Sequence, residues 1–347
     1  MLCRHVYNAA IGERREAWWM RGVSVTYYQQ KAELPGIKEA MPEYGEVHSQ
    51  VLQDVILRVD RAFQAFFRRV KNGETPGYPR FHGRNRYNSF TYPQVGEHGG
   101  ARLDNGFLVL AKIGRITVRW SRPIEGTAKT VTISKEVDGW YVCFSCADVP
   151  MRPLPATGQE TGIDLGLEAF ATLSNGTRIF HPGWYRQAER ALKTAQRRVS
   201  RRKKGSNRRR KAVTQLRKAH LKVKRQRADF HHKTALALVH ENDTIYHEDL
   251  QTANMLQNHH LAKSIADAGW STFLTILSYK AACAGRSVVA VPPAYTSQTC
   301  SGCGAMVCKG LSVRWHSCPD CGVALHRDHN AAKNIERLGQ SLRREVA

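Results

Sequence analysis

The segment "TCSGCGAMVCKGLSVRWHSCPDCGVALHRDHNAAKNI", Thr299 to Ile335, holds two Cys-x-x-Cys pairs followed by the start of a helix. The first pair is Cys300 and Cys303, and the second, after fourteen intervening residues, is Cys318 and Cys321. Two such pairs present four thiolates to one small cation, for which tetrahedral Zn²⁺ is the natural occupant. Four cysteine ligands leave no open coordination position, so the segment predicts a structural zinc ribbon.

The nine cysteines of the chain are expected to bind metal or to remain thiols, because nothing predicts export. The N-terminal stretch "MLCRHVYNAAIGERREAWW" lacks the apolar region of a secretory signal, and no run of eighteen apolar residues predicts a membrane span. We therefore expect a protein of a reducing cytoplasm without a membrane partner. Cys308 and His316 lie between the two pairs and could replace a ligand, and rubredoxin-like iron is an alternative occupant.

Three acidic residues occupy places where a carboxylate is costly unless it is paired or binds a metal. Asp164 lies in "GIDLGL" on a predicted buried strand, where Gly162 and Gly166 are expected to let a phosphate come close. Glu248 lies in "TIYHEDL" on a second strand, and Asp328 begins a helix. Taken singly, each has a structural interpretation, since strand ends are often solvated and an aspartate can cap a helix. Together they are the ligands that two Mg²⁺ ions need to span a scissile phosphate.

Basic residues outnumber acidic ones by 53 to 29, and most of the excess lies in one stripe. Between Arg186 and Arg227 there are nineteen lysines and arginines against one acid, Glu189. A break at Gly205-Ser206-Asn207 predicts that the stripe folds as a hairpin of two helices. This density of charge indicates a nucleic acid, because neutralised phosphates release counterions, although a solvated face or an acidic membrane surface is an alternative. The residues expected to contact nucleic acid are Arg197, Arg198, Arg201, Arg202, Lys203, Lys204, Arg208, Arg209, Arg210 and Lys211.

The remaining sequence changes its hydrophobic period twice. The first eighty-odd residues are predicted to be helical, and "EVHSQVLQDVILRVDRAFQAFFRRVKNG" (46–73) places apolar residues at three- and four-residue intervals. The stretch "TPGYPRFHGRNRYNSFTYP" (75–93) mixes aromatic residues with arginine, which predicts a loop that either stacks on bases or packs as a lid. Over residues 87–150, apolar residues alternate with polar ones in short runs, which predicts a small antiparallel barrel or sandwich. Beyond a linker at 154–160, short strands alternate with helices.

Five motifs carry a resemblance to a known family. In chain order, "GIDLGLEAFATLSNG", "HEDL", "YTSQTCSGCG", "SCPDCG" and "DHNAAKNI" resemble the RuvC-type nuclease region of TnpB proteins. These are transposon-encoded, RNA-guided nucleases of the OrfB type, similar to the compact type V CRISPR effectors. The resemblance covers about half of the chain, from Gly162 to Asn334, and extends more weakly to "GYPRFHGRNRYNSFTYP" and "RHVYNAA".

The resemblance implies an α+β, multidomain chain. A helical recognition region (1–86) would be inserted in a small β-barrel, the wedge domain (87–157). An RNase H-like (RuvC) α/β nuclease domain (158–347) would follow, with the zinc ribbon at about 296–324 inserted ahead of the third acid. Members of this family usually begin with a β-strand before the first helix, whereas this chain starts almost at "RHVYNAA". The barrel is therefore expected to lack its first strand.

By the same resemblance, the expected function is RNA-guided cleavage of double-stranded DNA, with a transcript of the transposon end as guide, in a prokaryotic cytoplasm at the nucleoid. Asp164, Glu248 and Asp328 would hold two Mg²⁺ ions, or Mn²⁺, of which one activates a water and the other stabilises the leaving 3′-oxygen. The four cysteines would hold one Zn²⁺. Two alternatives are an RNA-guided DNA-binding repressor that does not cleave, and a guide-independent nuclease such as a junction resolvase. Loss of one of the three acids would indicate the repressor, and all three are present.

Overall fold

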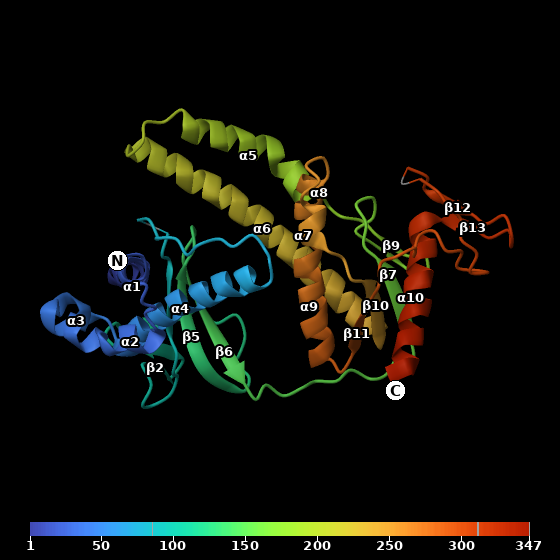
Figure 1. Cartoon of the computed structure of the whole chain (residues 1–347). Helices are drawn as coiled ribbons and strands as arrows, with labels where there is room; N and C mark the ends of the chain where they lie inside the picture. Colours follow the sequence, from blue (N-terminus) through green and yellow to red (C-terminus); the bar gives the residue numbers. More distant parts are fainter. Residues whose placement is uncertain (85, 311, 347) are drawn as a thin grey trace. The chain divides into compact units, whose positions relative to one another are not determined.

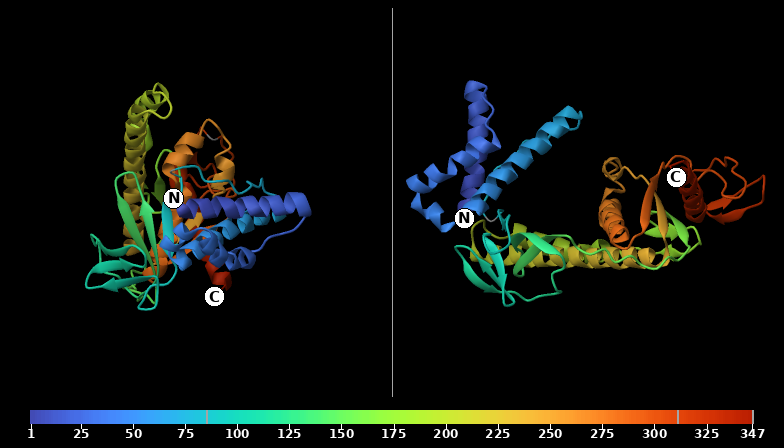
Figure 2. Two further views of the ribbon diagram at one scale, coloured as in Figure 1. Left: turned by 90° about the vertical axis from the view of Figure 1, so that its left-hand side faces the viewer. Right: turned by 90° about the horizontal axis from the view of Figure 1, so that it is seen from below.

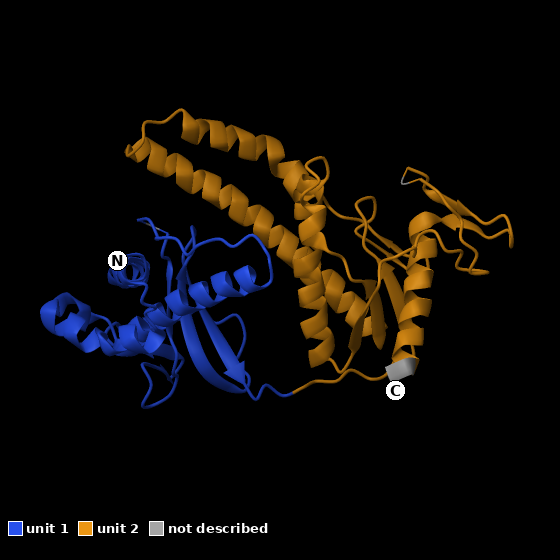
Figure 3. Cartoon of the chain, viewed as in Figure 1, with its two compact units in different colours: residues 1–150 blue, residues 151–347 orange. Residues whose placement is uncertain are grey.

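The chain divides into two compact units, residues 1–150 and 151–347 (Figure 3). The computed structural model describes residues 1–84, 86–310 and 312–346. Each unit buries apolar cores of its own. None of the helices in these described ranges is both long and apolar enough to cross a membrane.

Helices make up the first part of unit 1 (Figure 1). They are α1 (Leu2–Arg21), α2 (Tyr27–Ala32), α3 (Leu34–Ala40), the 3₁₀ helix η1 (Pro42–Glu46) and α4 (Ser49–Lys71). Helix α4 confirms the helix predicted within residues 46–73. The core between α1 and α4 includes Ile11, Leu52, Val55 and Val59. Arg14 ties three helices together, because its guanidinium donates to Gln30 Oε1 on α2 at 2.8 Å and pairs with Asp60 Oδ1 on α4 at 3.0 Å.

The aromatic loop that follows α4 packs against the helices. Tyr78 makes edge contacts with Phe63 and Phe66 of α4, at centroid distances of 5.6 and 5.4 Å. His82 lies against Tyr7 of α1 at 4.6 Å, also edge-on. Of the two interpretations of this stretch, the contacts of Tyr78 and His82 favour packing over base stacking.

Two antiparallel sheets complete unit 1. One contains β1 (Ser89–Tyr92), β5 (Thr127–Lys135) and β6 (Trp140–Ala147) in the order β1-β5-β6. The other contains β2 (Ala101–Asp104), β3 (Phe107–Leu110) and β4 (Gly114–Thr117), paired in chain order. Both sheets contribute to one core that includes Tyr92, Leu108, Leu110, Val131 and Ile133. The alternation in this region therefore forms small antiparallel sheets, as predicted.

A mixed five-stranded sheet lies at the centre of unit 2, with the strand order β11-β10-β7-β8-β9. Its strands are β7 (Glu160–Asp164), β8 (Ala171–Leu173), β9 (Arg178–Ile179), β10 (Thr244–Glu248) and β11 (Ser287–Val291). Strands β7, β10 and β11 are parallel, whereas β8 and β9 run antiparallel to their neighbours. The carboxyl ends of parallel strands lie at one edge of a sheet, so β7 and β10 deliver their last residues to the same edge.

Helices surround this sheet and extend from it (Figure 2). They are α5 (Trp184–Ser200), α6 (Asn207–Glu241), α7 (Thr252–Met255), α8 (Ala262–Ala268), α9 (Trp270–Cys283) and α10 (Arg327–Val346). A short hairpin of β12 (Trp315–Ser317) and β13 (Ala324–His326) precedes α10. The break predicted at Gly205-Ser206-Asn207 separates α5 from α6, and the two helices pack as the predicted hairpin. The main core includes Ile163, Phe170, Leu238, Ile245, Phe273 and Leu277.

Two glycines allow α10 to lie close to the sheet. A Cβ on Gly162 of β7 would lie 2.1 Å from the carbonyl oxygen of Ala332, and one on Gly339 of α10 would lie 2.0 Å from the Tyr246 ring of β10. Contacts this short are sterically excluded. The expectation that Gly162 admits a phosphate is therefore wrong, because the space beside it is filled by helix α10.

Candidate metal centres and nucleic-acid interface

The three predicted acids come from elements that meet at one edge of the sheet. Asp164 is the last residue of β7, Glu248 is the last residue of β10, and Asp328 lies in the first turn of α10. The parallel pairing of Thr244 with Glu160 and of His247 with Ile163 continues by one residue to set Glu248 beside Asp164. The side chains of Asp164 and Glu248 are half-buried, and Asp328 is buried.

The electrostatics of this edge favour the binding of a cation. Burial raises the pKa of Asp164 well above its usual range, and the nearby charges of Glu248 and Asp328 raise it further, while Arg327 and Arg314 oppose them. Burial also raises the pKa of Glu248, against a hydrogen bond that the Thr296 hydroxyl donates to Glu248 Oε1. Carboxylates that repel one another in a poorly solvated place are stabilised by a divalent cation between them. The donor set therefore fits hard metal ions such as Mg²⁺.

The three acids are not among the compact groups of ligand atoms in the described part of the chain. Across the described residues, two groups of three or more side chains have ligand atoms all within 4.8 Å of one another: the four ribbon cysteines, and Glu168, His326 and Asp328. The oxygens of Asp164, Glu248 and Asp328 do not form such a group. Of the three acids, Asp328 belongs to one of these two groups, together with Glu168 and His326.

The four predicted zinc ligands form a compact group of sulfurs. The Sγ atoms of Cys300 and Cys321 are 3.6 Å apart, and those of Cys303 and Cys318 are also 3.6 Å apart. A tetrahedral Zn²⁺ with bonds of about 2.3 Å separates its sulfurs by roughly 3.8 Å, so the group fits zinc and its members are not disulfide-bonded. Burial raises the pKa of Cys300, but the backbone N–H groups of Cys303 and Gly302 and the nearby ring of His316 lower it to about 5, whereas burial and the neighbouring sulfurs raise the pKa of Cys321 to about 12.

The two residues between the cysteine pairs lie outside this group. Cys308 is exposed, and its sulfur is not among the four that converge. His316 is fully buried, and its Nδ1 contacts the Lys309 ammonium. Its ring lies near Cys300 and helps to lower the pKa of that thiol. Neither residue replaces a cysteine in the group.

Helix α10 fastens the ribbon through two asparagines that the sequence analysis did not single out. Asn330 Oδ1 accepts from the Ser301 N–H at 2.9 Å, and its Nδ2 donates to the Thr299 carbonyl at 2.7 Å. One turn later, Asn334 Nδ2 donates to the carbonyls of Thr296 and Thr299 at 2.8 and 2.6 Å. The first knuckle is thus fixed to the helix that carries the third acid. The only signal in the sequence was two polar residues four apart on the buried face of an amphipathic helix.

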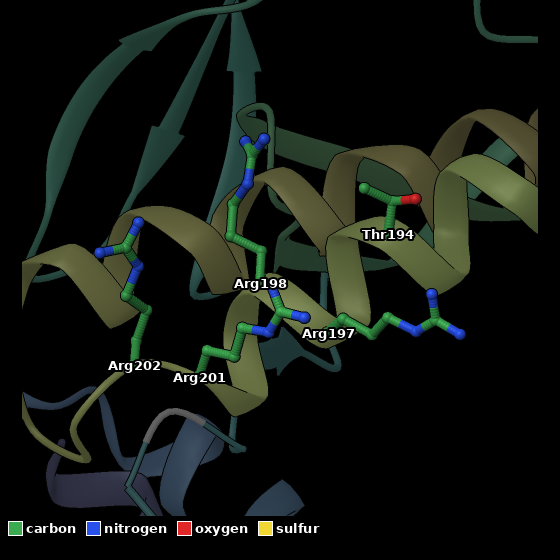
Figure 4. Close-up of a pocket in the computed structure, with 5 residues that line it drawn as sticks. All are labelled: Thr194, Arg197, Arg198, Arg201 and Arg202. Atoms are coloured by element: carbon green, nitrogen blue, oxygen red, sulfur yellow. The ribbon is translucent and has the colours of Figure 1, made fainter.

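The basic hairpin of α5 and α6 offers shallow pockets lined by arginine. One pocket of about 500 Å³ is lined by Thr194, Arg197, Arg198, Arg201 and Arg202 (Figure 4). A second of about 440 Å³ is lined by Arg198, Arg202, Arg208, Lys211, Ala212 and Gln215. Glu189, the single acid of the stripe, is neutralised by Lys263 at 2.8 Å and Lys193 at 3.0 Å. Since no acid follows until Asp229, the outer part of the hairpin is electropositive and suits phosphate groups.

One of the predicted nucleic-acid contacts has a structural role in the hairpin. Arg209 Nη1 donates to the carbonyl of Val199 at 2.7 Å, at the end of α5. Ser206 caps α6, because its Oγ accepts from the Arg209 N–H at 3.2 Å. Arg209 therefore joins the two helices at their turn, and the neighbouring Arg208 and Lys211 line the second pocket.

Comparisons with known proteins agree with this arrangement. A family profile of OrfB proteins, described as "Probable transposase", matches residues 132–259, and one described as "Cas12f1-like, TNB domain" matches residues 270–335. A Streptomyces pristinaespiralis protein named "Putative RNA-guided DNA endonuclease" is 37% identical over 345 residues, which cover 97% of this chain and 83% of the relative. The Escherichia coli (strain K12) protein "Putative RNA-guided DNA endonuclease InsQ" is 31% identical over 361 residues, covering 98% and 87%.

One of the solved structures that match this chain shows a similar fold. It is Cas12f1 in a complex with its guide RNA and target DNA, and it matches with a TM-score of 0.61 at 14% identity. The match covers 96% of this chain and 80% of the Cas12f1 chain. The mixed α/β, multidomain architecture is therefore shared with a compact effector of this type.

Proposed function

Because this chain belongs to the OrfB (TnpB) family of transposon-encoded proteins, we propose that it is an RNA-guided endonuclease that cleaves double-stranded DNA. The observation that carries the proposal is the set of three carboxylates at one sheet edge, where Asp164 is destabilised by burial and by its two acidic neighbours. Such a set has little structural value without a cation. It suits the metal-dependent hydrolysis of a phosphodiester.

In this mechanism Asp164, Glu248 and Asp328 bind two divalent ions, Mg²⁺ or Mn²⁺. When bound, the ions activate a water and stabilise the leaving 3′-oxygen. The hydroxyl of Thr296 orients Glu248 by donating to Oε1. The Asp328 N–H donates to His326 Nδ1 at 3.3 Å, which fixes the first turn of α10 relative to the ribbon. The partial burial of the acids limits water around them and strengthens their attraction for cations.

The basic hairpin supports nucleic acid as the partner. Its outer pockets, built from Arg198, Arg202 and their neighbours, would hold backbone phosphates without reading bases. Sequence selection would come from pairing between the DNA and a guide RNA transcribed from the transposon end. The protein would then act in the prokaryotic cytoplasm at the nucleoid. Cys300, Cys303, Cys318 and Cys321 would hold one structural Zn²⁺, which stabilises the ribbon.

We assign the regions of the chain by the same family relationship. Residues 1–86 would form the recognition region, 87–157 the wedge domain, and 158–347 the RuvC nuclease domain, with the ribbon at about 296–324.

Cleavage by protein co-expressed with transposon-end RNA tests the function. The purified complex is incubated with a matched linear DNA and Mg²⁺, beside an unmatched DNA and protein expressed without the RNA. We expect cutting only of the matched DNA by the RNA-bound protein. Binding of the matched DNA without any cutting would favour the repressor. Equal cutting with and without the RNA would favour a guide-independent nuclease.

A further inference from the structure

Glu168 lies four residues after Asp164, on the loop between β7 and β8, and contacts three basic groups. Its Oε1 accepts from Arg178 Nη2 at 2.6 Å, and its Oε2 lies 3.5 Å from Arg314 Nε. The Oε1 atom is also 3.7 Å from His326 Nε2. Arg314 belongs to the ribbon and His326 ends β13, so Glu168 connects the loop after the first acid to the segment that precedes the third.

The ring of His326 extends this connection to Asp328. The backbone N–H of Asp328 donates to His326 Nδ1 at 3.3 Å, and Nδ1 also lies 3.7 Å from Asp328 Oδ2. The other ring nitrogen, Nε2, faces the carboxylate of Glu168. At 3.7 Å the contact is longer than a hydrogen bond and acts through charge. The ring of His326 therefore lies between the carboxylates of Glu168 and Asp328 and links the two residues.

We propose that Glu168 is a positioning residue of the metal centre, which holds Asp328 and Arg314 in their places relative to Asp164. The inference rests on the proposed function, since it concerns the same three acids. Two of the groups that Glu168 holds act directly on the centre: Asp328 is one of the acids, and the charge of Arg314 reaches Asp164.

Glu168 differs from an ordinary surface ion pair in the number and origin of its partners. An exposed ion pair contributes little to stability, and Glu168 is 40% exposed. Its partners, however, are Arg178 of β9, Arg314 of the ribbon and His326 of β13, so Glu168 joins β9 to segments more than 130 residues later in the chain. A carboxylate of this kind adds little to the stability of the fold but restricts the ribbon to one position against the sheet. Its removal is therefore expected to affect metal affinity more than unfolding.

The test compares Glu168→Gln, Glu168→Ala and the control Glu241→Gln in the full chain. Glu241 is an exposed glutamate at the end of α6 in the same unit. The first readout is the Mg²⁺ concentration for half-maximal cleavage by the RNA-bound protein. Loss of a residue that orients a metal ligand costs roughly 10-fold to 100-fold in metal affinity. We expect an increase of that order for Glu168→Ala, a smaller one for Glu168→Gln, which can still accept from Arg178, and none for Glu241→Gln.

The second readout needs no cleavage. The zinc-containing protein, without nucleic acid, is melted at increasing Mn²⁺, and the Mn²⁺ concentration for half-maximal stabilisation is compared among the same variants, with Asp328→Asn as a reference for a damaged centre. A shift in Mn²⁺ requirement with no cutting by the wild type would refute the proposed function and leave the role of Glu168 standing. Unchanged requirements for both ions would overturn the role of Glu168. So would loss of zinc from Glu168→Ala, because the residue would then merely hold the ribbon together.

Discussion

Glu248 and Asp164 end the parallel strands β10 and β7, each one residue beyond the paired residues His247 and Ile163, so the sheet brings two carboxylates to the same edge. Asp328 of α10 adds a third negative charge that Asp164 senses. If these acids act as one metal centre, the effects of their substitution on the cleavage rate should not add. We expect Asp164→Ala and Glu248→Ala each to abolish Mg²⁺-dependent cleavage, and the double variant to be little worse than either. Single-turnover cleavage of the matched DNA measures this.

Binding of the matched DNA by the same variants should persist, because affinity comes from the basic hairpin and from base pairing. Asp249→Ala is the matched control, since Asp249 is exposed just after the end of β10. It should retain most activity. An Asp164→Ala variant that cuts at nearly the wild-type rate would refute the assignment of the acids.

The raised pKa of Asp164 predicts a pH-dependent effect on stability. The folded state binds this proton more tightly than the unfolded state, so stability of the metal-free protein falls as pH rises from about 3.9 through the raised pKa. Asp164→Asn removes the charge. At pH 7.5 it should raise the melting temperature of the Mg²⁺-free protein by about 2 to 4 °C, the effect of about 1 kcal/mol in a unit of this size. Near pH 4 the gain should vanish. A lower melting temperature for Asp164→Asn at pH 7.5 would contradict the origin of the shift.

Removal of one ribbon cysteine should release zinc and destabilise unit 2. Cys300→Ser or Cys318→Ser breaks a closed set of thiolates, and binding energy at such a site is folding energy. We expect substoichiometric zinc and a loss of several kcal/mol in unfolding free energy. Cys308→Ser is the control, because that residue is exposed and outside the group. Elemental analysis and thermal melting check both, and a native protein without zinc would exclude the ribbon as a zinc site.

Charge at the tip of the hairpin should control salt dependence. Replacing Arg201, Arg202, Lys203 and Lys204 with Ala should lower the slope of log affinity against log salt by roughly 0.7 to 0.9 for each phosphate that the variant no longer neutralises. Arg209→Ala separates charge from structure, since its guanidinium donates to the Val199 carbonyl. We expect that variant to loosen the turn more than it changes the slope. A quadruple variant with an unchanged slope would show that these residues only face solvent.

Local patterns in the sequence were sufficient to predict several elements. The spacing of apolar residues predicted α4, the Gly205-Ser206-Asn207 break predicted the hairpin, and an acid at the end of each apolar strand identified Asp164 and Glu248. Contacts between distant segments were not predictable, because they depend on how the elements pack. The contact of Gly162 with α10 and the partners of Glu168 are of this kind. In both cases the residue type gave no indication of its neighbour.

The length of helix α6 determines how far the basic hairpin extends from the core of unit 2. Its 35 residues extend about 52 Å, and its residues that pack against the sheet core, such as Ala235, Leu238 and Val239, lie near its C-terminal end. The part ahead of Arg227, residues 207–226, is about 30 Å long, which is the rise of roughly nine base pairs of duplex. Removing seven residues from α5 and seven from α6, about two turns each, would shorten the arm by about 10 Å, or roughly three base pairs. If the hairpin binds a duplex as proposed, the number of phosphates within its reach would depend on the number of helical turns and not on the three acids.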